Sequence, residues 1–420
     1  MKKPLRMILC FALAAALALP LSAPPAAAAA KPAGAVGFTA DDYLTVNNRE
    51  LVNRRGEKVK LKGANLGAWL IMEDWLCPYE EVGDNYELLE TLIARFGVQK
   101  AYELMNTYED NFITAYDLDQ IAAMGFNCVR VPFWYRNFYY DDNGSKILDS
   151  NGDWDFSRLD WVVRECSARR IYVILDMHGA PGFQSDAPHS GKADSNGLFA
   201  KTPQGERYRE LTDELWTAIA ARFRGNPAVA MYDLLNEPCC DMPVTELQRR
   251  IYNEGIYKRL YKTVRAADED HIITLECIWT PLALPQVRTH NWQNVVYQVH
   301  FYNNSDFIFA AFLLLTRLYH PGIPLMMGEF YPLGRTTWKG CFRTMENLGF
   351  SWMLWTYKGA GHLMWESDWC LKGSKDGFER AKIKTDPFAE IARKWGAYLR
   401  TENGYTDTGH YRNNVEAFLG

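Results

Sequence analysis

The 420-residue sequence lacks several patterns that are typical of other protein classes. Its nine cysteines include no Cys-x-x-Cys pair, so the ligand spacing of a zinc finger is absent. The stretch Gly63-Ala64-Asn65-Leu66-Gly67 lacks the Gly-x-Gly-x-x-Gly spacing of a dinucleotide-binding loop. No Ser/Thr/Pro-rich linker, repeat or low-complexity tract divides the chain. These absences favour one large folded domain over a series of small modules.

Long apolar runs are also scarce. The first one, residues 7–19, follows Lys2, Lys3 and Arg6 and precedes the small residues 26–30. A basic start, a short apolar core and small residues are the features of a secretory signal peptide. We therefore predict that residues 1–30 are a cleaved signal, that residues 31–420 form a single domain, and that the protein is secreted.

No later run is long enough to span a membrane, since the most apolar, residues 307–315, has the length of a strand or half a helix. The formal net charge is −5, and loss of the three signal-peptide bases makes it −8, with both signs scattered along the chain. This balance favours neither nucleic acid nor an acidic membrane as a partner. Oligomeric state stays open at this point.

The eight cysteines that follow the signal could be paired in many ways. Three lie in or beside predicted strands and helices, where a free buried thiol is expected: Cys128, Cys166 and Cys277. Five lie in loops or at the ends of elements and are the better candidates for disulfide bonds: Cys77, Cys239, Cys240, Cys341 and Cys370. Aromatic residues make up 14% of the chain. A large core explains most of them, and a sugar-binding cleft would use the rest.

Short apolar strands alternate with helical segments from residue 61 onward. The predicted strands cover residues 61–67, 127–131, 171–176, 230–237, 272–276, 295–301, 323–330 and 350–355. Two shorter strands, 51–53 and 58–61, flank Gly56 as a hairpin. A helix over 86–107 should break near Gly97, and the last helix should run from Pro387 to residue 399. Eight strand and helix units predict an α/β fold, a (β/α)8 barrel with a short N-terminal β-hairpin.

Polar residues finish most of these strands, and the active site of such a barrel lies at the carboxyl ends of its strands. Two are acids, Glu237 and Glu329, which end buried runs on the fourth and seventh strands. The full set of candidates is Arg130, His178, Asn236, Glu237, His300, Tyr302, Glu329 and Trp355. Each alone has a structural explanation, but eight on one rim indicate a site.

Two carboxyl groups that face one another across a narrow mouth are what hydrolysis of a glycosidic bond requires. A separation of about 5–5.5 Å indicates double displacement, and about 6.5–9.5 Å leaves room for a water and gives inversion. Arg130 and Tyr302 near one carboxylate would keep it ionised, while burial would keep the other protonated. Asn236 and Glu237 can both reach the cleft only if the strand end twists or bulges, because neighbouring strand residues point to opposite faces.

The chain resembles glycoside hydrolase family 5, the cellulase-type barrels. The resemblance covers about residues 51–399 and rests on Arg130, His178, the Asn236-Glu237-Pro238 motif, His300 with Tyr302, Glu329 and Trp355. It implies a retaining mechanism with Glu237 as acid/base and Glu329 as nucleophile, with no metal or cofactor. The other six residues would support these two or bind substrate, a β-linked oligo- or polysaccharide.

Two stretches, 63–70 and 176–182, resemble the exo-β-1,3-glucanase and β-glucosidase branch of that family. The sequence departs from this branch at Gly328-Glu329-Phe330, because in that branch tryptophan usually follows the glutamate. Linkage and exo or endo action therefore stay open.

Two other functions fit parts of the sequence. A metal-dependent barrel hydrolase would use Asp176, His178, His189 and His300 as ligands, because the first two are spaced for shared ligation. It leaves Glu237 and Glu329 without a role. A secreted barrel that binds sugar without catalysis would keep Trp355 but would not need both acids.

Overall fold

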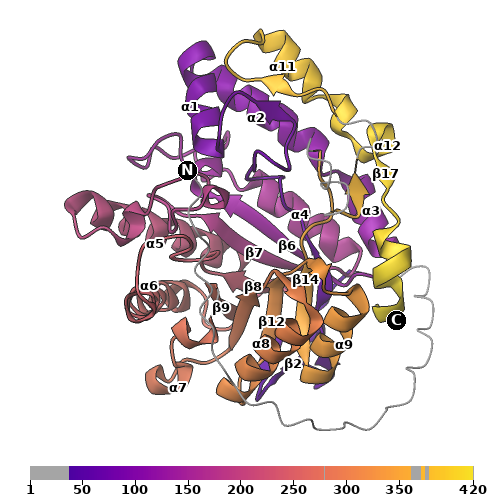
Figure 1. Ribbon diagram of the computed structural model, residues 1–420. Helices are drawn as coiled ribbons and strands as arrows, with labels where there is room; N and C mark the ends of the chain where they lie inside the picture. Colours follow the sequence, from indigo (N-terminus) through magenta and orange to yellow (C-terminus); the bar gives the residue numbers. More distant parts are fainter. Residues whose placement is uncertain (1–36, 279, 361–369, 374–377, 420) are drawn as a thin grey trace.

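The computed structural model describes residues 37–278, 280–360, 370–373 and 378–419, so the predicted signal peptide lies outside the described residues. Eight parallel strands close into a barrel with helices around it (Figure 1). In barrel order they are β4 (Lys62–Asn65), β6 (Cys128–Trp134), β7 (Tyr172–Gly179), β8 (Val229–Asp233), β9 (Ile272–Ile278), β10 (Val295–His300), β12 (Leu325–Glu329) and β14 (Phe350–Leu354). The predicted (β/α)8 barrel is confirmed.

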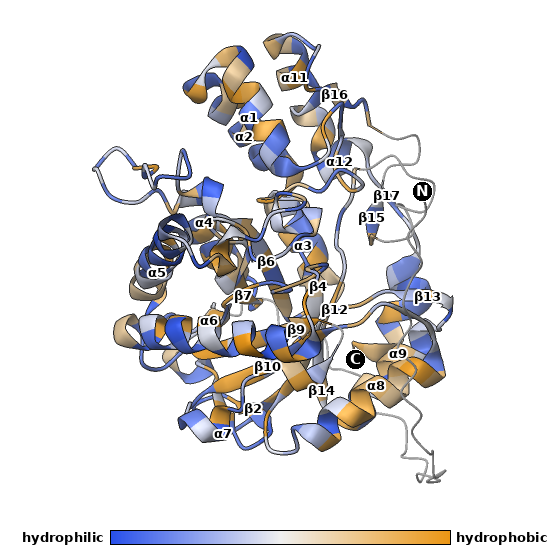
Figure 2. Ribbon diagram, turned by 60° about the vertical axis from the view of Figure 1, so that its left-hand side comes forward, coloured by the Kyte–Doolittle hydropathy of each residue, from blue (hydrophilic) through white to orange (hydrophobic). Residues whose placement is uncertain are grey.

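Figure 2 shows mixed hydrophilic and hydrophobic residues along α5 and α6 where they cover the barrel. Gly97, with φ of 82°, separates the first two helices as predicted. The helices are α1 (Asn85–Phe96), α2 (Val98–Phe112), α3 (Ala115–Ala123), α4 (Ser157–Ala168), α5 (Pro203–Phe223), α6 (Glu246–Ala267), α7 (Val287–His290), α8 (Asp306–Tyr319), α9 (Trp338–Leu348), α11 (Phe388–Lys394) and α12 (Thr401–Gly404). Within the described ranges, no helix has both the length and the apolar character to cross a membrane.

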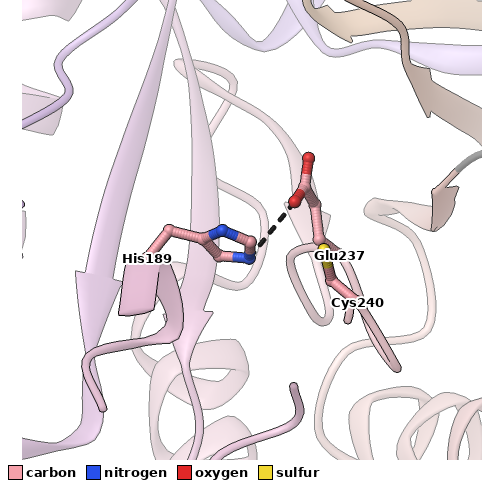
Figure 3. A group of neighbouring side chains, drawn as sticks. All are labelled: His189, Glu237 and Cys240. Carbon is pink, nitrogen blue, oxygen red and sulfur yellow. Dashed lines mark ion pairs between the residues drawn. The ribbon is translucent and has the colours of Figure 1, made fainter. Parts of the chain in front are cut away.

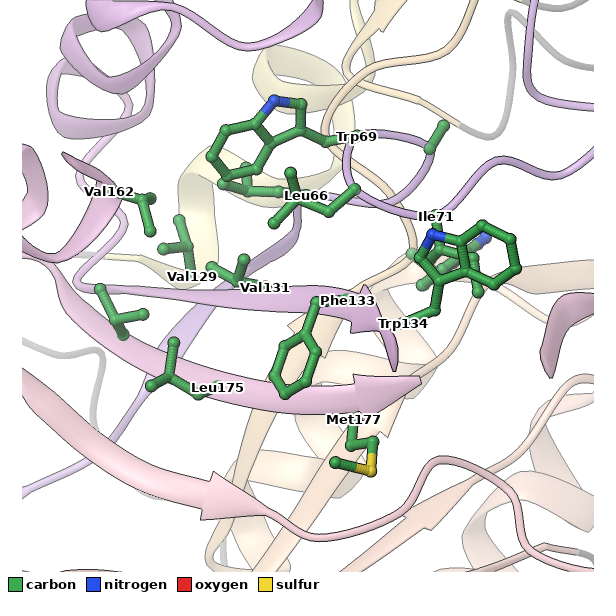
Figure 4. Close-up of a cluster of buried hydrophobic side chains, with 14 of the residues drawn as sticks. Leu66, Trp69, Ile71, Val129, Val131, Phe133, Trp134, Val162, Leu175 and Met177 are labelled. Atoms are coloured by element: carbon green, nitrogen blue, oxygen red, sulfur yellow. The ribbon is translucent and has the colours of Figure 1, made fainter. Parts of the chain in front are cut away.

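Side-chain alternation along the strands separates the outer core from the barrel interior. Val129, Val131 and Phe133 of β6 lie with Leu175 and other apolar residues in the layer between the strands and helix α4 (Figure 4). Because successive strand residues point to opposite faces, the intervening residue Arg130 points into the barrel. The same outer packing that stabilises the fold therefore delivers a charged side chain to its centre.

The amino end of the barrel is closed by an antiparallel sheet of β1 (Thr45–Asn47), β2 (Glu50–Val52) and β3 (Lys58–Val59). Leu44 and Leu51 of this segment pack on an apolar cluster inside the barrel that includes Ile174, Met231 and Met326. The predicted hairpin is confirmed. Polar side chains inside the barrel gather near the other, carboxyl end.

The C-terminal segment returns to the N-terminal part of the chain (Figure 1). Strand β16 (Ala381–Lys382) pairs in parallel with β5 (Tyr79–Glu80), and α11 contacts α2. Two further two-stranded sheets join β11 (Asn303–Ser305) to β13 (Pro332–Arg335) and β15 (Lys372–Gly373) to β17 (Thr406–Asp407). The expected single helix over 387–399 is wrong: α11 ends at Lys394, because Gly396 has non-helical φ and ψ of −81° and −142°.

Strand β6 does not end at Pro132 as expected but runs on to Trp134. The Arg130 carbonyl accepts from Leu66 N on the β4 side, so the N–H that Pro132 lacks would point to the same side. The last β4 residue paired with β6 is Asn65, opposite Arg130. Beyond it, β6 pairs along its length with β7 and makes one isolated bridge, from Phe133 to Leu70, so the proline leaves no ladder bond to β4 unmade.

Candidate active site

The predicted strand-end residues converge at the carboxyl end of the barrel. A cavity of about 190 Å³ is lined by Glu73, Trp75, His178, His189, Asn236, Glu237, Tyr302, Glu329 and Trp355. Arg130 and His300 lie behind this wall, fully buried and bonded to its carboxylates. A second cavity of about 320 Å³ shares Glu73, Trp75, His189, Glu237 and Tyr302 with the first. The two cavities therefore adjoin at Glu237.

Glu329 has a cation and a hydroxyl group as hydrogen-bond donors. Arg130 Nη1 donates to Oε1 at 2.8 Å, and Tyr302 Oη donates to Oε2 at 2.8 Å. Burial raises the pKa of Glu329, and the Arg130 charge and the Tyr302 hydrogen bond both oppose that increase. Of the two glutamates, Glu329 is therefore the one whose surroundings favour the ionised form.

Glu237 has neutral partners instead. Its Oε1 lies 2.9 Å from His300 Nδ1, and its Oε2 lies 3.2 Å from His189 Nε2. Burial and then the negative charge of Glu329 raise the pKa of Glu237 well above its ordinary value. A carboxyl group in this position holds its proton.

Glu237 reaches the cavity through an unusual backbone conformation. Strand β8 ends at Asp233, so the predicted strand to residue 237 is too long. Glu237 itself has φ of 42°, in the left-handed region that non-glycine residues seldom adopt. Its N–H donates to Glu276 Oε2 at 2.8 Å, and the preceding N–H, of Asn236, donates to Met177 O at 3.1 Å. This turn, in place of a strand end, brings both Asn236 and Glu237 to the cleft.

The proton on His300 can be assigned from its neighbours. Gln298 Nε2 lies 2.8 Å from Asp233 Oδ2 and 3.2 Å from His300 Nε2. An amide nitrogen only donates, so His300 Nε2 accepts and its proton sits on Nδ1. Burial lowers the pKa of His300 well below its ordinary value, so the ring is neutral. It therefore donates from Nδ1 toward Glu237.

The two glutamates face a common gap. One oxygen of Glu237, one oxygen of Glu329 and a ring nitrogen of His300 all lie within 4.8 Å of one another. His178 and Trp355 border the same space, their rings stacked with centroids 5.6 Å apart. His178 is in turn oriented by Asp176, whose Oδ2 is 2.7 Å from Nδ1.

Several polar residues of the site are absent from the sequence-based set. Asp233, Glu276 and Gln298 are buried in the barrel centre and bind Arg130, the Glu237 backbone and His300. All three lie between apolar residues on predicted strands, a pattern that places a polar side chain inside the barrel. Glu73 and Trp75 come from the loop after β4, where no periodic pattern marks them. Burial raises the pKa of Glu73 to about 8.

The expectation of disulfide bonds is wrong for Cys77, Cys239, Cys240 and Cys341, which are buried free thiols. Hydrogen bonds hold the loop that carries Cys239 and Cys240. Cys239 N donates to Gln184 O at 2.8 Å, and Arg249 binds the Cys239 carbonyl. Cys128, Cys166 and Cys277 are free, as predicted.

The ligand set of the metal-hydrolase alternative is not gathered in the described part of the chain. There, the groups of three or more possible ligands within 4.8 Å are His189 with Glu237 and Cys240, and Glu237 with His300 and Glu329. Asp176 and His178 belong to neither. Asp176 Oδ2 instead lies 3.1 Å from Arg130 Nη2, whose charge repels a cation.

Comparison with known proteins agrees with this architecture. Residues 93–361 match the family model described as cellulase, glycosyl hydrolase family 5. A β-xylosidase of Phanerodontia chrysosporium is 30% identical over 63% of this chain and 53% of its own length. A probable glucan 1,3-β-glucosidase A of Aspergillus clavatus is 30% identical over 63% of this chain and 60% of its own. The chain thus spans about half to three fifths of the length of these relatives.

Solved structures share the fold at low sequence identity. The rutinosidase from Aspergillus niger superposes with a TM-score of 0.56 at 15% identity, covering 80% of this chain and 97% of that one. An endogalactoceramidase gives 0.56 at 20% identity, covering 76% of this chain and 75% of that one.

A closed (β/α)8 barrel with two carboxyl groups on one cavity at its carboxyl end is the arrangement of the barrel glycoside hydrolases. Within that class, the match over residues 93–361 is decisive, and the chain belongs to glycoside hydrolase family 5.

Proposed function

We propose that the protein is a secreted, retaining β-glycosidase that hydrolyses β-glucans or β-glucosides by double displacement. Residues 1–30 are its secretory signal, and residues 31–420 form one catalytic domain. Glu329 is the nucleophile and Glu237 the acid/base. The observation that carries this proposal is the contrast between the two glutamates, one bonded to Arg130 and the other in contact with two neutral imidazoles.

The approach of the carboxyl groups supports retention. One oxygen of Glu237 and one oxygen of Glu329 lie within 4.8 Å of each other, which favours the closer carboxyl pair, about 5–5.5 Å apart, that a covalent intermediate requires. Inversion needs about 6.5–9.5 Å, because a water must fit between the sugar and the base.

In the first step, the Glu329 carboxylate attacks the anomeric carbon, and the bond to the leaving oxygen breaks. The Glu237 proton moves to that oxygen, so the aglycone leaves as an alcohol. Arg130 and Tyr302 aim the Glu329 carboxylate through their hydrogen bonds to its two oxygens. His300 Nδ1–H holds Glu237 through Oε1, leaving Oε2 turned toward His189 and the cavity.

In the second step, Glu237 is ionised and takes a proton from water as the water attacks the anomeric carbon. The ester bond to Glu329 breaks, and both glutamates return to their starting states. The loss of one carboxylate charge to the ester lowers the repulsion on Glu237, so its pKa falls and it becomes a competent acceptor only after the ester forms.

Adjoining cavities of about 190 and 320 Å³ support a substrate with a sugar on one side of the scissile bond and further units on the other. The named relatives act on β-xylosides and on 1,3-β-glucan, by their descriptions. We therefore expect a neutral β-linked glycoside, with Trp355 and His178 beside the reacting sugar.

Product analysis on β-1,3-, β-1,4- and mixed-linkage glucans, mannan and aryl β-glucosides tests this function. Hydrolysis of at least one β-glucoside or β-glucan is expected, and the preferred polymer identifies the linkage. A purified, folded protein that releases no sugar from any of them contradicts the proposal.

A further inference from the structure

A cluster of three possible metal ligands, His189, Glu237 and Cys240, lies where the two cavities adjoin. Figure 3 shows the three side chains converging from two loops, with the contact between His189 and Glu237 drawn as a dashed line. His189 lies in the short helix Pro188–Ser190 after β7, and the other two lie in the turn after β8. All three line the 320 Å³ cavity, so a small ion can reach them from there.

The donor atoms suit a borderline-soft divalent cation. One imidazole nitrogen, one carboxylate oxygen and one sulfur lie within 4.8 Å of one another. His189 Nε2 and Glu237 Oε2 are 3.2 Å apart, near the ~3.4 Å edge of a tetrahedron with zinc–ligand bonds of about 2.1 Å. Cys240 Sγ lies within 4.8 Å of both atoms and can take the third corner, and the adjoining cavity has room for a water at the fourth.

An unmade interaction points to the same ligand. The Nε2 atom of His189 is shielded from solvent and has no hydrogen bond of normal geometry, although Glu237 Oε2 is near. A buried polar atom without such a bond is costly, and coordination would satisfy it. Thiolate, carboxylate and neutral imidazole together balance the two positive charges of the ion.

We propose that His189, Glu237 and Cys240 form an inhibitory site for one divalent cation of the zinc and cadmium class. Binding displaces the Cys240 thiol proton and the Glu237 carboxyl proton to solvent. The cation then occupies the oxygen that delivers the proton to the leaving group, so glycoside cleavage stops until the ion is removed. The inhibition therefore rests on the proposed role of Glu237, whereas the binding itself does not.

Cysteines 239 and 240 provide a matched pair for the test. Cys239 is the adjacent residue, but its Sγ contacts Asn253 Oδ1 at 3.7 Å, and it belongs to no ligand group in the described ranges. Both residues are buried free thiols. We therefore compare wild type with Cys240→Ser, Cys240→Ala and Cys239→Ser.

The primary measurement is titration with CdCl2 alone, following the ultraviolet charge-transfer absorption of a cadmium thiolate. Wild type and Cys239→Ser should show the band at one equivalent, and both Cys240 variants should lack it. Loss of a ligand should weaken binding by at least about tenfold, since even outer-shell changes cost 10–100-fold. His189→Gln should keep a weaker band. A band that persists in folded Cys240 variants, or is absent from wild type, overturns the proposal.

Glycosidase activity is measured in parallel with Zn²⁺ and Cd²⁺. The inhibitory concentration should rise at least about tenfold in Cys240→Ser and stay unchanged in Cys239→Ser. Equal inhibition of both variants overturns the inhibitory role. A wild-type band in a protein without glycosidase activity contradicts the proposed function and leaves the cation site standing, so the two failures are distinguishable.

Discussion

Glu237 and Glu329 border one cavity but occupy different electrostatic surroundings. Glu329 accepts hydrogen bonds from a guanidinium and a phenol, whereas the contacts of Glu237 are the imidazoles of His300 and His189. Both carboxyls are buried, and burial raises the pKa of both. The nearby cation distinguishes them, because Arg130 bonds to only one. Two identical side chains can thus favour different protonation states through their neighbours alone.

The largest effect is expected from Glu329→Gln. The substitution is nearly isosteric and removes the carboxylate that we propose as the nucleophile, so kcat should fall by about 10⁴- to 10⁶-fold on every substrate. Steady-state kinetics on an aryl glucoside and an oligosaccharide measure it. Glu402→Gln, on an exposed part of α12, is the control and should be unaffected. Residual activity above about 1% of wild type would show that Glu329 is not the nucleophile.

Glu237→Gln should separate substrates by their leaving groups. General acid catalysis contributes about 10²- to 10⁴-fold, so glycosides with poor leaving groups should lose roughly that much kcat/KM. Aryl glycosides with strongly acidic phenols need no proton and should lose far less in the glycosylation step. Equal losses of kcat/KM across a series of aryl leaving groups would contradict the assignment of Glu237 as the acid.

Tyr302→Phe tests the Glu329 side by pH dependence. In the proposed mechanism activity requires Glu329 ionised and Glu237 protonated, so the kcat/KM profile should be a bell whose apparent pKa values belong to the pair. The Tyr302 hydroxyl bonds the charged form and lowers the pKa of Glu329, so its removal raises that pKa. The acidic limb should move to higher pH by about one unit, equivalent to ~1.4 kcal/mol, with the basic limb nearly fixed. A shift of the basic limb alone would contradict the assignment.

Chelation should have the smallest effect. Neither glutamate requires a metal in this mechanism, so EDTA should not reduce the activity of purified protein. Loss of activity on dialysis against EDTA, restored by a divalent cation, would favour the metal-dependent hydrolase.

Much of this arrangement was predictable from the sequence. Apolar runs that stop at polar residues mark the strands, and because the active site of such a barrel lies at the carboxyl ends of its strands, the sequence alone groups Arg130, His178, His300 and Glu329. The (β/α)8 fold and the break at Gly97 followed from the same patterns. These patterns give only local information, namely which residues alternate along a segment and where an apolar run ends.

The remaining features depend on register and on long-range neighbours. Strand β6 continues through Pro132 because its pairing with β4 ends before that residue. The residues around Pro132 do not reveal where a neighbouring strand ends. Glu237 reaches the cleft through a turn held by Glu276 from another strand. Cys239 and Cys240 occupy a loop, which suggested a bridge, but hydrogen bonds from Arg249 and to Gln184 hold that loop instead.

Proton NMR of the first sugar released from a β-glucoside, recorded before the anomers equilibrate, tests the central claim most directly. Two carboxyl groups within 4.8 Å predict that the β anomer appears first and the α anomer grows in later by mutarotation. Initial release of the α anomer would mean single displacement by water, and the roles assigned to Glu237 and Glu329 would be wrong.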